Sequence, residues 1–367
     1  MLFVKKGIRF LGFFSFVWLL TSCGTLTNTP RFAMVLDNPS TTSGSASAGT
    51  VSVFSVIKST GVLSPIGSSV QTGKNPTAIT SDLHGRLLYV ANTSDGSVSA
   101  YGINRTTGNI SSSPNSPFAT GTNPISLVID AKTRFLFVAN QGSNTISTFK
   151  INQTDASLKP VSGAPFGASG SPLSLAVAPS DKFLYAALGT SGIGVFSINS
   201  AGALTLVSQQ APPATITSAS SLVLSPNGKF LYVVDGVKTV SAYTVDAATG
   251  NLTLIGSPSV TGAQPGAVVV DPLGRYVYTA NQGSSDISAF TINADGSLTE
   301  ISGSPFVTGT QPLGITVDPS SRFVYTANDA DQSVSVFAIN GTTTPGALGA
   351  EEASATGAPA QSVTITR

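Results

Sequence analysis

The sequence predicts an all-β protein, a seven-bladed β-propeller of four-stranded blades, on three observations. An aromatic residue recurs seven times at intervals of 47 or 48 residues, each time inside an alternating apolar run. A basic residue also recurs seven times, directly before a second apolar run. Only 10% of the residues are charged, and no run of helical period and useful length follows the first 23 residues. Units of this size match a four-stranded propeller blade.

The chain begins with a predicted leader. Three basic residues among the first nine precede an eleven-residue apolar run, which is shorter than the roughly 20 residues that span a bilayer. Residues 20–23, Leu-Thr-Ser-Cys, resemble the bacterial lipobox, in which the peptide is cut before the cysteine and the thiol is diacylated. We expect residues 1–22 to be a lipoprotein signal peptide and residues 23–30 to be an acylated cysteine, Cys23, with a tether. A plain secretory signal with an incidental cysteine is the alternative.

This leader predicts an extracytoplasmic protein held to the bacterial membrane through Cys23. Gly24 follows the cysteine, where an aspartate would mark inner-membrane retention, so an outer-membrane or cell-surface location is favoured. The formal net charge of the chain is +1, and this excludes a strongly basic nucleic-acid binder. We expect a monomer with no cofactor, and a carbohydrate or an envelope protein as its ligand.

Two markers define the repeat beyond the leader. The aromatic positions are Phe54, Tyr101, Phe149, Phe196, Tyr243, Phe290 and Phe337. The basic positions are Arg31, Arg86, Arg134, Lys182, Lys229, Arg275 and Arg322. A proline also precedes a further apolar run in six repeats, and Ala219 replaces it in the seventh. The markers together divide residues 31–367 into seven units, which form one propeller domain.

Each unit reads as four short strands, and the third unit is an example. Residues 126–129 form a continuous apolar run, as expected for a strand that is buried on both faces. Residues 135–139 form the second strand, and residues 145–151 form the third with alternating sides. A weaker outer strand runs from Leu158 to about Phe166 before a segment rich in proline and glycine.

The two ends of the domain are complementary halves of one blade. The first unit lacks an innermost strand, because only residues 24–30 separate Cys23 from Arg31. Residues 361–367 read as an innermost strand with nothing after it. The C-terminal strand is therefore predicted to complete the first blade beside residues 32–36, which closes the ring and leaves neither edge unpaired.

The second strands carry a family resemblance. Residues 88–92 read Leu-Tyr-Val-Ala-Asn, and residues 277–281 read Val-Tyr-Thr-Ala-Asn with Asp-Pro-Leu-Gly-Arg ahead of them. These sequences resemble the repeats of lactonase-family seven-bladed propellers, which overlap with the so-called YVTN surface-protein repeats. The resemblance implies the propeller fold. It also implies an activity like that of 6-phosphogluconolactonases or muconate-lactonising enzymes, at one mouth of the central channel, with histidine, glutamate and arginine side chains.

The sequence supplies few of these side chains. His84 is the only histidine and falls in the turn between a first and a second strand, on the face opposite the usual active mouth. The three glutamates, Glu300, Glu351 and Glu352, fall in outer strands. A lactonase would therefore have to use Asp37 or Asp235 at the mouth as its base. We expect a binding or interaction module of the cell envelope, with a lactonase that acts on a sugar lactone such as 6-phosphogluconolactone as the alternative.

A polar residue lies six positions after most of the basic residues, at the end of the second strand. The set is Asp37, Asn92, Asn140, Leu188, Asp235, Asn281 and Asn328. The asparagines either end the strand or form an amide-rich rim that suits hydroxyl-rich ligands such as sugars. We treat as candidate ligand-binding residues Asn92, Asn140, Gln141, Asn281, Gln282 and Asn328. The rim offers no arginine or lysine for a phosphate, which disfavours a phosphorylated sugar.

Acidic residues also lie four positions before several of the arginines, at Asp82, Asp130, Asp271 and Asp318. We expect each to accept the amide hydrogens of a hairpin turn and to pair with its arginine. The alternative is a basic ring that attracts an anionic partner. No metal site is expected, because the chain has one histidine and one cysteine. Asp329 and Asp331 offer at most oxygen ligands for calcium, or cap their own loop.

Overall fold

The computed structural model describes residues 30–38, 47–211 and 218–366. Every regular element in these ranges is a β-strand. The strands form seven antiparallel sheets, numbered as blades 1 to 7, which confirms the predicted all-β fold and blade number. The expected leader and Cys23 lie outside the described residues. In the ranges that are described, no helix has the length and apolar character needed to cross a bilayer.

The first three blades each contain five strands, named here from the innermost strand outwards, and the last two strands of each blade both pair with its third strand. Blade 1 contains β32 (Ala360–Ile365), β1 (Phe32–Asp37), β2 (Ala48–Val56), β3 (Leu63–Pro65) and β4 (Val70–Lys74). Blade 2 contains β5 (Pro76–Ser81), β6 (Leu87–Asn92), β7 (Ser97–Ile103), β8 (Ile110–Ser112) and β9 (Phe118–Ala119). Blade 3 contains β10 (Pro124–Ile129), β11 (Phe135–Asn140), β12 (Thr145–Ile151), β13 (Leu158–Pro160) and β14 (Phe166–Gly167).

The other four blades follow the same order. Blade 4 contains β15 (Ser174–Val177), β16 (Phe183–Ala187), β17 (Ile193–Ile198) and β18 (Leu204–Gln210). Blade 5 contains β19 (Ser221–Leu224), β20 (Phe230–Val234), β21 (Thr239–Val245) and β22 (Leu252–Val260). Blade 6 contains β23 (Pro265–Val270), β24 (Tyr276–Asn281), β25 (Asp286–Ile292), β26 (Leu298–Glu300) and β27 (Phe306–Val307). Blade 7 contains β28 (Pro312–Val317), β29 (Phe323–Asn328), β30 (Ser333–Ile339) and β31 (Leu348–Ala355).

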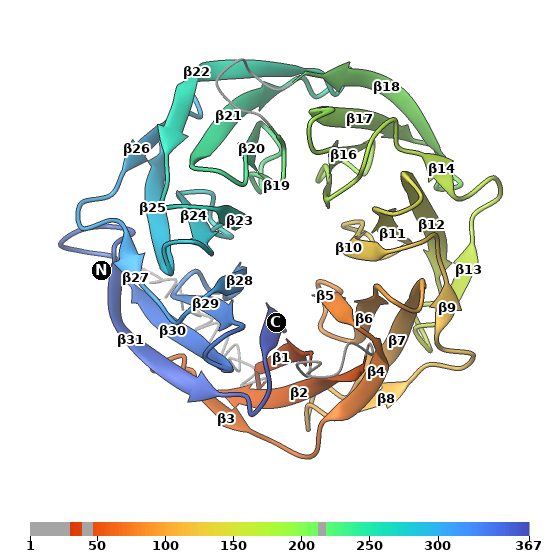
Figure 1. Ribbon diagram of the computed structural model, residues 1–367, viewed down its shortest axis with the longest axis horizontal. Coiled ribbons are helices and arrows are strands. Elements are labelled where there is room, and N and C mark those ends of the chain that lie inside the picture. Colours follow the sequence, from red (N-terminus) through yellow and green to blue (C-terminus); the bar gives the residue numbers. More distant parts are fainter. Residues whose placement is uncertain (1–29, 39–46, 212–217, 367) are drawn as a thin grey trace, which may run out of the picture.

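The seven sheets stand around a common centre, with the innermost strand of each blade toward the axis (Figure 1). Each innermost strand contacts the innermost strands of both neighbouring blades, so the inner ring is continuous. The outer strand is one element in blades 4, 5 and 7 and two short elements in blades 1, 2, 3 and 6. The single outer strand that the sequence predicts for residues 158–166 is thus two strands, β13 and β14.

The ring closes as predicted, through the pairing of the two ends of the described chain. β32 runs antiparallel to β1, with Ala33 opposite Ile365 and Val35 opposite Val363. Figure 1 shows β32 between β28 and β5, directly inside β1. Two hydrogen bonds join Phe32 to Thr366 beyond the ladder. β1 therefore has a strand partner on its inner edge, as the second strands of the other blades have.

The core is divided among the seven blade interfaces. Seven clusters of buried apolar residues are present, and each combines side chains of two adjacent blades. The cluster between blades 7 and 1 includes Tyr325 of β29 together with Val35 of β1 and Val363 of β32. The second strands are buried on both sides, which explains why they read as continuous apolar runs.

Tyrosines in five second strands join each blade to the next. Each hydroxyl donates to a backbone carbonyl in the loop between the third and fourth strands of the following blade, at 2.9 to 3.1 Å. The donors are Tyr89, Tyr185, Tyr232, Tyr278 and Tyr325. Burial raises the pKa of every one of these hydroxyls, so each stays protonated and keeps its donor.

Tyr278→Phe is expected to lower the free energy of unfolding by about 1–2 kcal/mol, because it leaves the buried carbonyl of Gly346 without its 2.9 Å donor. Tyr276→Phe is the matched control on the same strand, since no hydrogen bond of its hydroxyl is present among the described residues. The control is expected to change stability by less than about 0.5 kcal/mol. Urea unfolding measures both. Equal losses would show that the tyrosines act by packing alone.

The four predicted aspartate turns are present, with one change of partner. Each aspartate accepts the backbone amides of the arginine four residues on and of the residue after it. Asp130 and Asp271 pair with their own arginines at 2.8 and 2.9 Å, and Asp82 lies 3.6 Å from Arg86. The prediction that Asp318 pairs with Arg322 is wrong. Asp318 pairs with Arg31 at 2.7 Å, because ring closure brings the start of blade 1 against blade 7.

Candidate functional site

The propeller has two faces, set by its loops. The mouth face carries the loops between the second and third strands and the loops that enter each innermost strand. The turn face carries the turns between the first and second strands and the loops between the third and fourth strands. All the polar residues predicted for the rim end a second strand or follow it, so they belong to the mouth face.

The four predicted asparagines are wholly buried and are hydrogen-bonded within their own blades. Each side-chain amide donates to the residues five and seven positions later, on the third strand. Asn92, for example, donates to the hydroxyls of Ser97 and Ser99 at 3.1 and 2.9 Å. The same pattern occurs at Asn140, Asn281 and Asn328. These amides tie the second strand to the third.

A glycine of the loop that enters the blade covers each asparagine. A Cβ atom on Gly309 would lie 2.4 Å from Nδ2 of Asn328, and one on Gly73 would lie 2.6 Å from Cγ of Asn92. Only glycine allows the loop to approach so closely. The asparagines therefore lie beneath the rim, so ligand contact by Asn92, Asn140, Asn281 or Asn328 stays a prediction. So does contact by Gln141 and Gln282, which are half-buried in the adjoining loops.

Asp37 occupies this position in blade 1 and behaves differently. Its side chain is 1% exposed, and the Ser52 hydroxyl donates to Oδ2 at 2.5 Å, but no described residue bonds Oδ1. Burial raises the pKa of the carboxyl to about 7, and the Ser52 hydrogen bond acts in the opposite direction. The equivalent covering glycine, Gly357, has no neighbouring atom where its Cβ would lie. An acid thus replaces the amide at this position in blade 1, and it is as buried as the asparagines.

Further polar groups lie next to Asp37 along the chain or across the β1–β32 pairing. The Asn38 side-chain amide donates to Asn75 of the loop into blade 2 at 2.7 Å. Gln361, next to the residue that pairs with Asp37, donates to Asp329 of blade 7 at 2.5 Å. Burial raises the pKa of Asp329 as well. We call Asp37, Asn38, Asn75, Asp329 and Gln361 the closure cluster. It brings residues from blades 7, 1 and 2 to one place on the mouth face.

Asp235, the other predicted base, serves as a turn cap. Its Oδ1 accepts the backbone amides of residues 237, 238 and 239 at 2.8 to 2.9 Å. Its Oδ2 accepts the Thr239 hydroxyl at 2.9 Å. Both carboxylate oxygens therefore already have donors. The spacing of the repeat treats Asp37 and Asp235 as equivalent. The structure distinguishes them, because Oδ1 of Asp37 has no hydrogen-bond donor among the described residues and both oxygens of Asp235 have one.

The other acidic and histidine candidates lie away from the closure cluster or are already bonded. His84 is exposed on the turn face, 3.5 Å from Asp82. Glu351 lies in the outer strand β31 and accepts the Ser335 hydroxyl. Asp331 accepts the backbone amide of Thr310, so it does not converge with Asp329 on a common point. Within the described ranges no group of three or more His, Cys, Asp or Glu residues is arranged to hold a metal ion.

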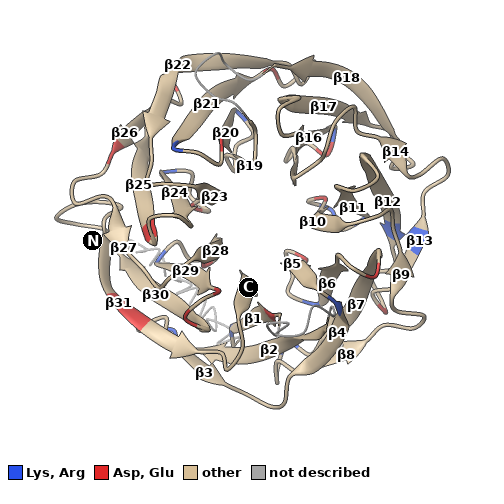
Figure 2. Ribbon diagram, viewed as in Figure 1, with Lys and Arg blue, Asp and Glu red and all other residues tan. Residues whose placement is uncertain are grey.

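The central channel has uncharged walls. The seven innermost strands consist of Ala, Gly, Val, Leu, Ile, Ser, Thr and Pro with the single amide of Gln361. Figure 2 shows these strands without acidic or basic colouring, while charge appears on loops and on outer strands such as β13 and β31. Acid–base groups near the axis must therefore come from the loops and turns at the two faces, and the closure cluster lies on the mouth face.

Comparison with protein families gives one match over most of the chain. The family model described as "Lactonase, 7-bladed beta-propeller" matches residues 40–363. A comparison with curated proteins gave no match.

Solved structures of similar shape include several bacterial propellers. A putative 6-phosphogluconolactonase from Bacteroides fragilis is 20% identical, with a TM-score of 0.78, and the match covers 93% of this chain and 99% of that one. The Pseudomonas aeruginosa periplasmic gluconolactonase PpgL is 20% identical, with a TM-score of 0.75 and coverage of 91% and 99%. A Lactobacillus plantarum protein is 22% identical, with a TM-score of 0.74 and coverage of 92% and 100%. At these identities the likeness concerns the fold.

Proposed function

Because the chain belongs to the lactonase family of seven-bladed β-propellers, we propose that it hydrolyses the ring ester of a sugar lactone at the closure cluster. The observation that carries the proposal is Asp37, a buried carboxyl with a pKa of about 7 and one oxygen free of hydrogen bonds. A general base is most effective when its pKa lies near the working pH. Strongly perturbed carboxyls also concentrate at functional sites.

The chemistry assigned to Asp37 is proton transfer. Its Oδ1 takes a proton from a water molecule as the water oxygen bonds to the lactone carbonyl carbon. The ring C–O bond then breaks, and the departing ring oxygen receives the proton from Asp37. The product is the open-chain hydroxy acid, and the carboxylate is restored. Ser52 holds Oδ2 in place throughout, which leaves Oδ1 as the reacting oxygen.

The substrate class follows from the chemistry of the cluster. The closure cluster offers two carboxyl groups and three side-chain amides, which suit the hydroxyl groups of a sugar ring. It contains no basic side chain for a phosphate, so a neutral lactone is favoured over a phosphorylated one. Relatives of the same fold include a gluconolactonase and a putative 6-phosphogluconolactonase, and their names support a sugar lactone as the substrate.

Asp37→Asn is expected to lower lactone hydrolysis by about 100-fold or more, because asparagine cannot accept the proton. The variant should fold, since asparagine occupies this position in blades 2, 3, 6 and 7. Proton release from glucono-1,5-lactone and from 6-phosphogluconolactone, corrected for the spontaneous rate, measures the loss. Asp235→Asn is the matched control and should keep turnover within a few-fold. Equal turnover in wild type and Asp37→Asn would remove Asp37 from the mechanism.

A binding module is the second candidate function, favoured by the uncharged walls of the channel. Under this proposal the mouth face binds a carbohydrate or an envelope protein and no turnover is found with any lactone. We also propose that the chain is an extracytoplasmic monomer, with a lipid on Cys23 that holds it at the outer membrane or cell surface. Lipid labelling that disappears in Cys23→Ser is the test of the anchor.

A further inference from the structure

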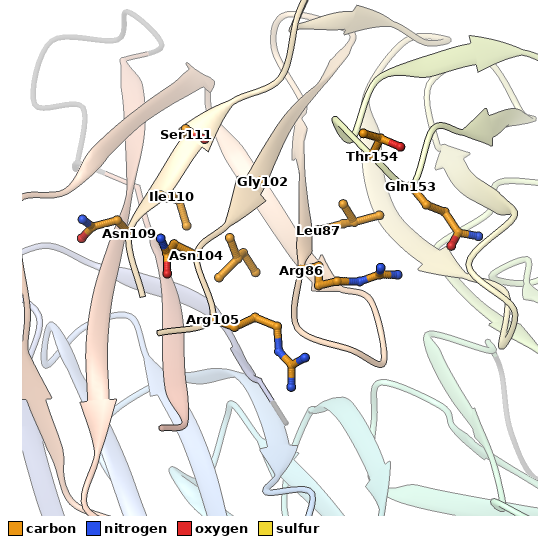
Figure 3. Close-up of a pocket in the computed structure, with 11 residues that line it drawn as sticks. Arg86, Leu87, Gly102, Asn104, Arg105, Asn109, Ile110, Ser111, Gln153 and Thr154 are labelled. Carbon is orange, nitrogen blue, oxygen red and sulfur yellow. The ribbon is translucent and has the colours of Figure 1, made fainter. Parts of the chain in front are cut away.

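An open pocket of about 740 Å³ lies on the turn face between blades 2 and 3, on the opposite face of the propeller from the closure cluster. Leu87, Ile103 and Ile110 provide its apolar surface, and Arg86 and Arg105 provide its charge. Figure 3 shows the two arginine side chains at the same end of this pocket, with Gln153 of blade 3 at its side. No residue of the proposed lactonase site lines it.

Arg105 has no partner among the residues that the structure describes. It is exposed, and no hydrogen bond, ion pair or ring contact joins it to another residue of the described ranges. The equivalent residue of blade 3 is Gln153, whose amide donates to the carbonyls of Lys132 and Thr133. The same loop position in blades 5 and 6 is alanine. The fold therefore does not require a cation at this position.

Arg86 is held less firmly than the arginines that occupy its position in other blades. Arg134 and Arg275 bond their aspartates at 2.8 and 2.9 Å and lie over the aromatic ring that follows them. Arg86 lies 3.6 Å from Asp82, and Leu87 follows it instead of an aromatic residue. Its Nε is buried and makes no hydrogen bond among the described residues, so only the outer part of its guanidinium group is open to a ligand. Arg86 and Arg105 both line the same pocket.

Gly102 creates much of the space between them. It is the last residue but one of β7, in regular register opposite Leu87, and its φ is not positive. A Cβ atom there would meet only Ser111 Oγ, at 3.8 Å. Neither the backbone nor the packing requires glycine, and close approach of a ligand is one of the reasons for which a strand carries glycine. The neighbouring hollow of blade 3, where Lys150 replaces this glycine, is about 490 Å³.

We infer that this pocket binds an anionic saccharide, a sugar unit that bears a carboxylate or a phosphate. Two guanidinium groups recognise such an oxyanion by paired, charge-assisted hydrogen bonds. The side chains of Asn109 and Ser111 offer partners for sugar hydroxyls, and the partly exposed Ile110 offers an apolar contact for a sugar ring. Among the described residues, Asp82 is the carboxylate that contacts Arg86, and it makes no ion pair with Arg105.

Titration calorimetry of the full-length protein with glucuronate, glucose 6-phosphate and glucose tests this site. Binding of at least one anionic sugar with a Kd below about 1 mM is expected, with glucose weaker by about 10-fold or more. The two anionic sugars distinguish a carboxylate from a phosphate ligand. No binding of either, or equal binding of glucose, would overturn the inference.

Two variants locate the binding in this pocket. Arg105→Gln should weaken it by about 10- to 100-fold, and Gly102→Thr should do so by filling the space. Thr244 and Thr291 occupy the glycine position in blades 5 and 6, so the blade accepts threonine.

Arg134→Gln is the control variant. It removes one charge elsewhere on the turn face and should leave Kd within twofold. An equal effect of Arg105→Gln and Arg134→Gln would assign the binding to general charge and overturn the inference. Lactone hydrolysis should be unchanged in Gly102→Thr, which separates this site from the proposed lactonase site.

Discussion

A chain that ends at Pro359 is expected to lose the native fold. The deletion removes β32, whose Val363 and Ile365 are 5% and 8% exposed and pack into the core between blades 7 and 1. Each such side chain contributes roughly 1.5–3 kcal/mol, and β1 loses its whole inner ladder of hydrogen bonds. This loss approaches the 5–15 kcal/mol that stabilises a typical protein. Circular dichroism and size exclusion should show loss of the cooperative melting transition, or aggregation through the exposed strand edge.

A circular permutant is the control for this deletion. It keeps every strand, joins the C-terminus to Arg31 by a short flexible linker, and opens the chain at the exposed Gly341. The ends to be joined already lie together, because Phe32 bonds Thr366. The permutant should melt cooperatively, as the full chain does. A truncated chain as stable as the full one would contradict ring closure by β32.

The ring itself could be predicted because it repeats. Seven near-equal intervals define the blades, and two half-blades at the ends of residues 31–367 define the closure. The partner of Asp318 could not be predicted, because Arg31 is 287 residues away and meets it only once the ring is closed. The split of the outer strand was also missed, since proline and glycine in residues 158–167 obscure the alternation on which strand prediction depends.

The sequence predicts which positions of the repeat belong to the candidate site. It does not predict how far each side chain is buried or what it bonds to. Spacing correctly gives Asp37 and Asn92 the same place in two blades, yet burial decides what each side chain does. The serines that accept the Asn92 amide lie five and seven residues later, and that signal is visible in the sequence once the role is known. The closure cluster was missed except for Asp37. The predicted closure puts residues 361–367 beside blade 1, which was the available sign that Gln361 approaches Asp37.

Asp37→Asn is expected to stabilise the protein above pH 7 and to flatten the dependence of its stability on pH. The pKa of Asp37 is about 7 in the folded protein, against an ordinary value of 3.8. Below pH 3.8 the carboxyl is protonated in the folded and in the unfolded protein, so its titration does not change the free energy of unfolding. Between these values the folded state keeps a proton that the unfolded state releases, so the wild type loses stability as the pH rises. The loss is complete above about pH 7.

The size of this effect is large for a single side chain. A pKa difference of this magnitude corresponds to about 4 kcal/mol when the whole window is crossed. The free energy of unfolding of Asp37→Asn, measured in urea at several pH values from 4 to 8.5, should therefore exceed that of the wild type by an amount that grows through this range. Asp329 titrates in the same direction but is present in both proteins, so it cancels from the comparison. Parallel curves for the two proteins would contradict the prediction.

Ser52→Ala separates the titration of Asp37 from the simple loss of a contact. The Ser52 hydroxyl lowers the pKa of Asp37, so its removal should move the descending part of the stability curve to higher pH. Asp235→Asn should instead lower stability by about 1 kcal/mol, because it removes a turn cap. If Asp37→Asn is the more stable protein above pH 7 and is also inactive, the carboxyl opposes stability at its own position. Four other blades carry the neutral amide at this position. A carboxyl that destabilises the fold there is then explained by its role in proton transfer.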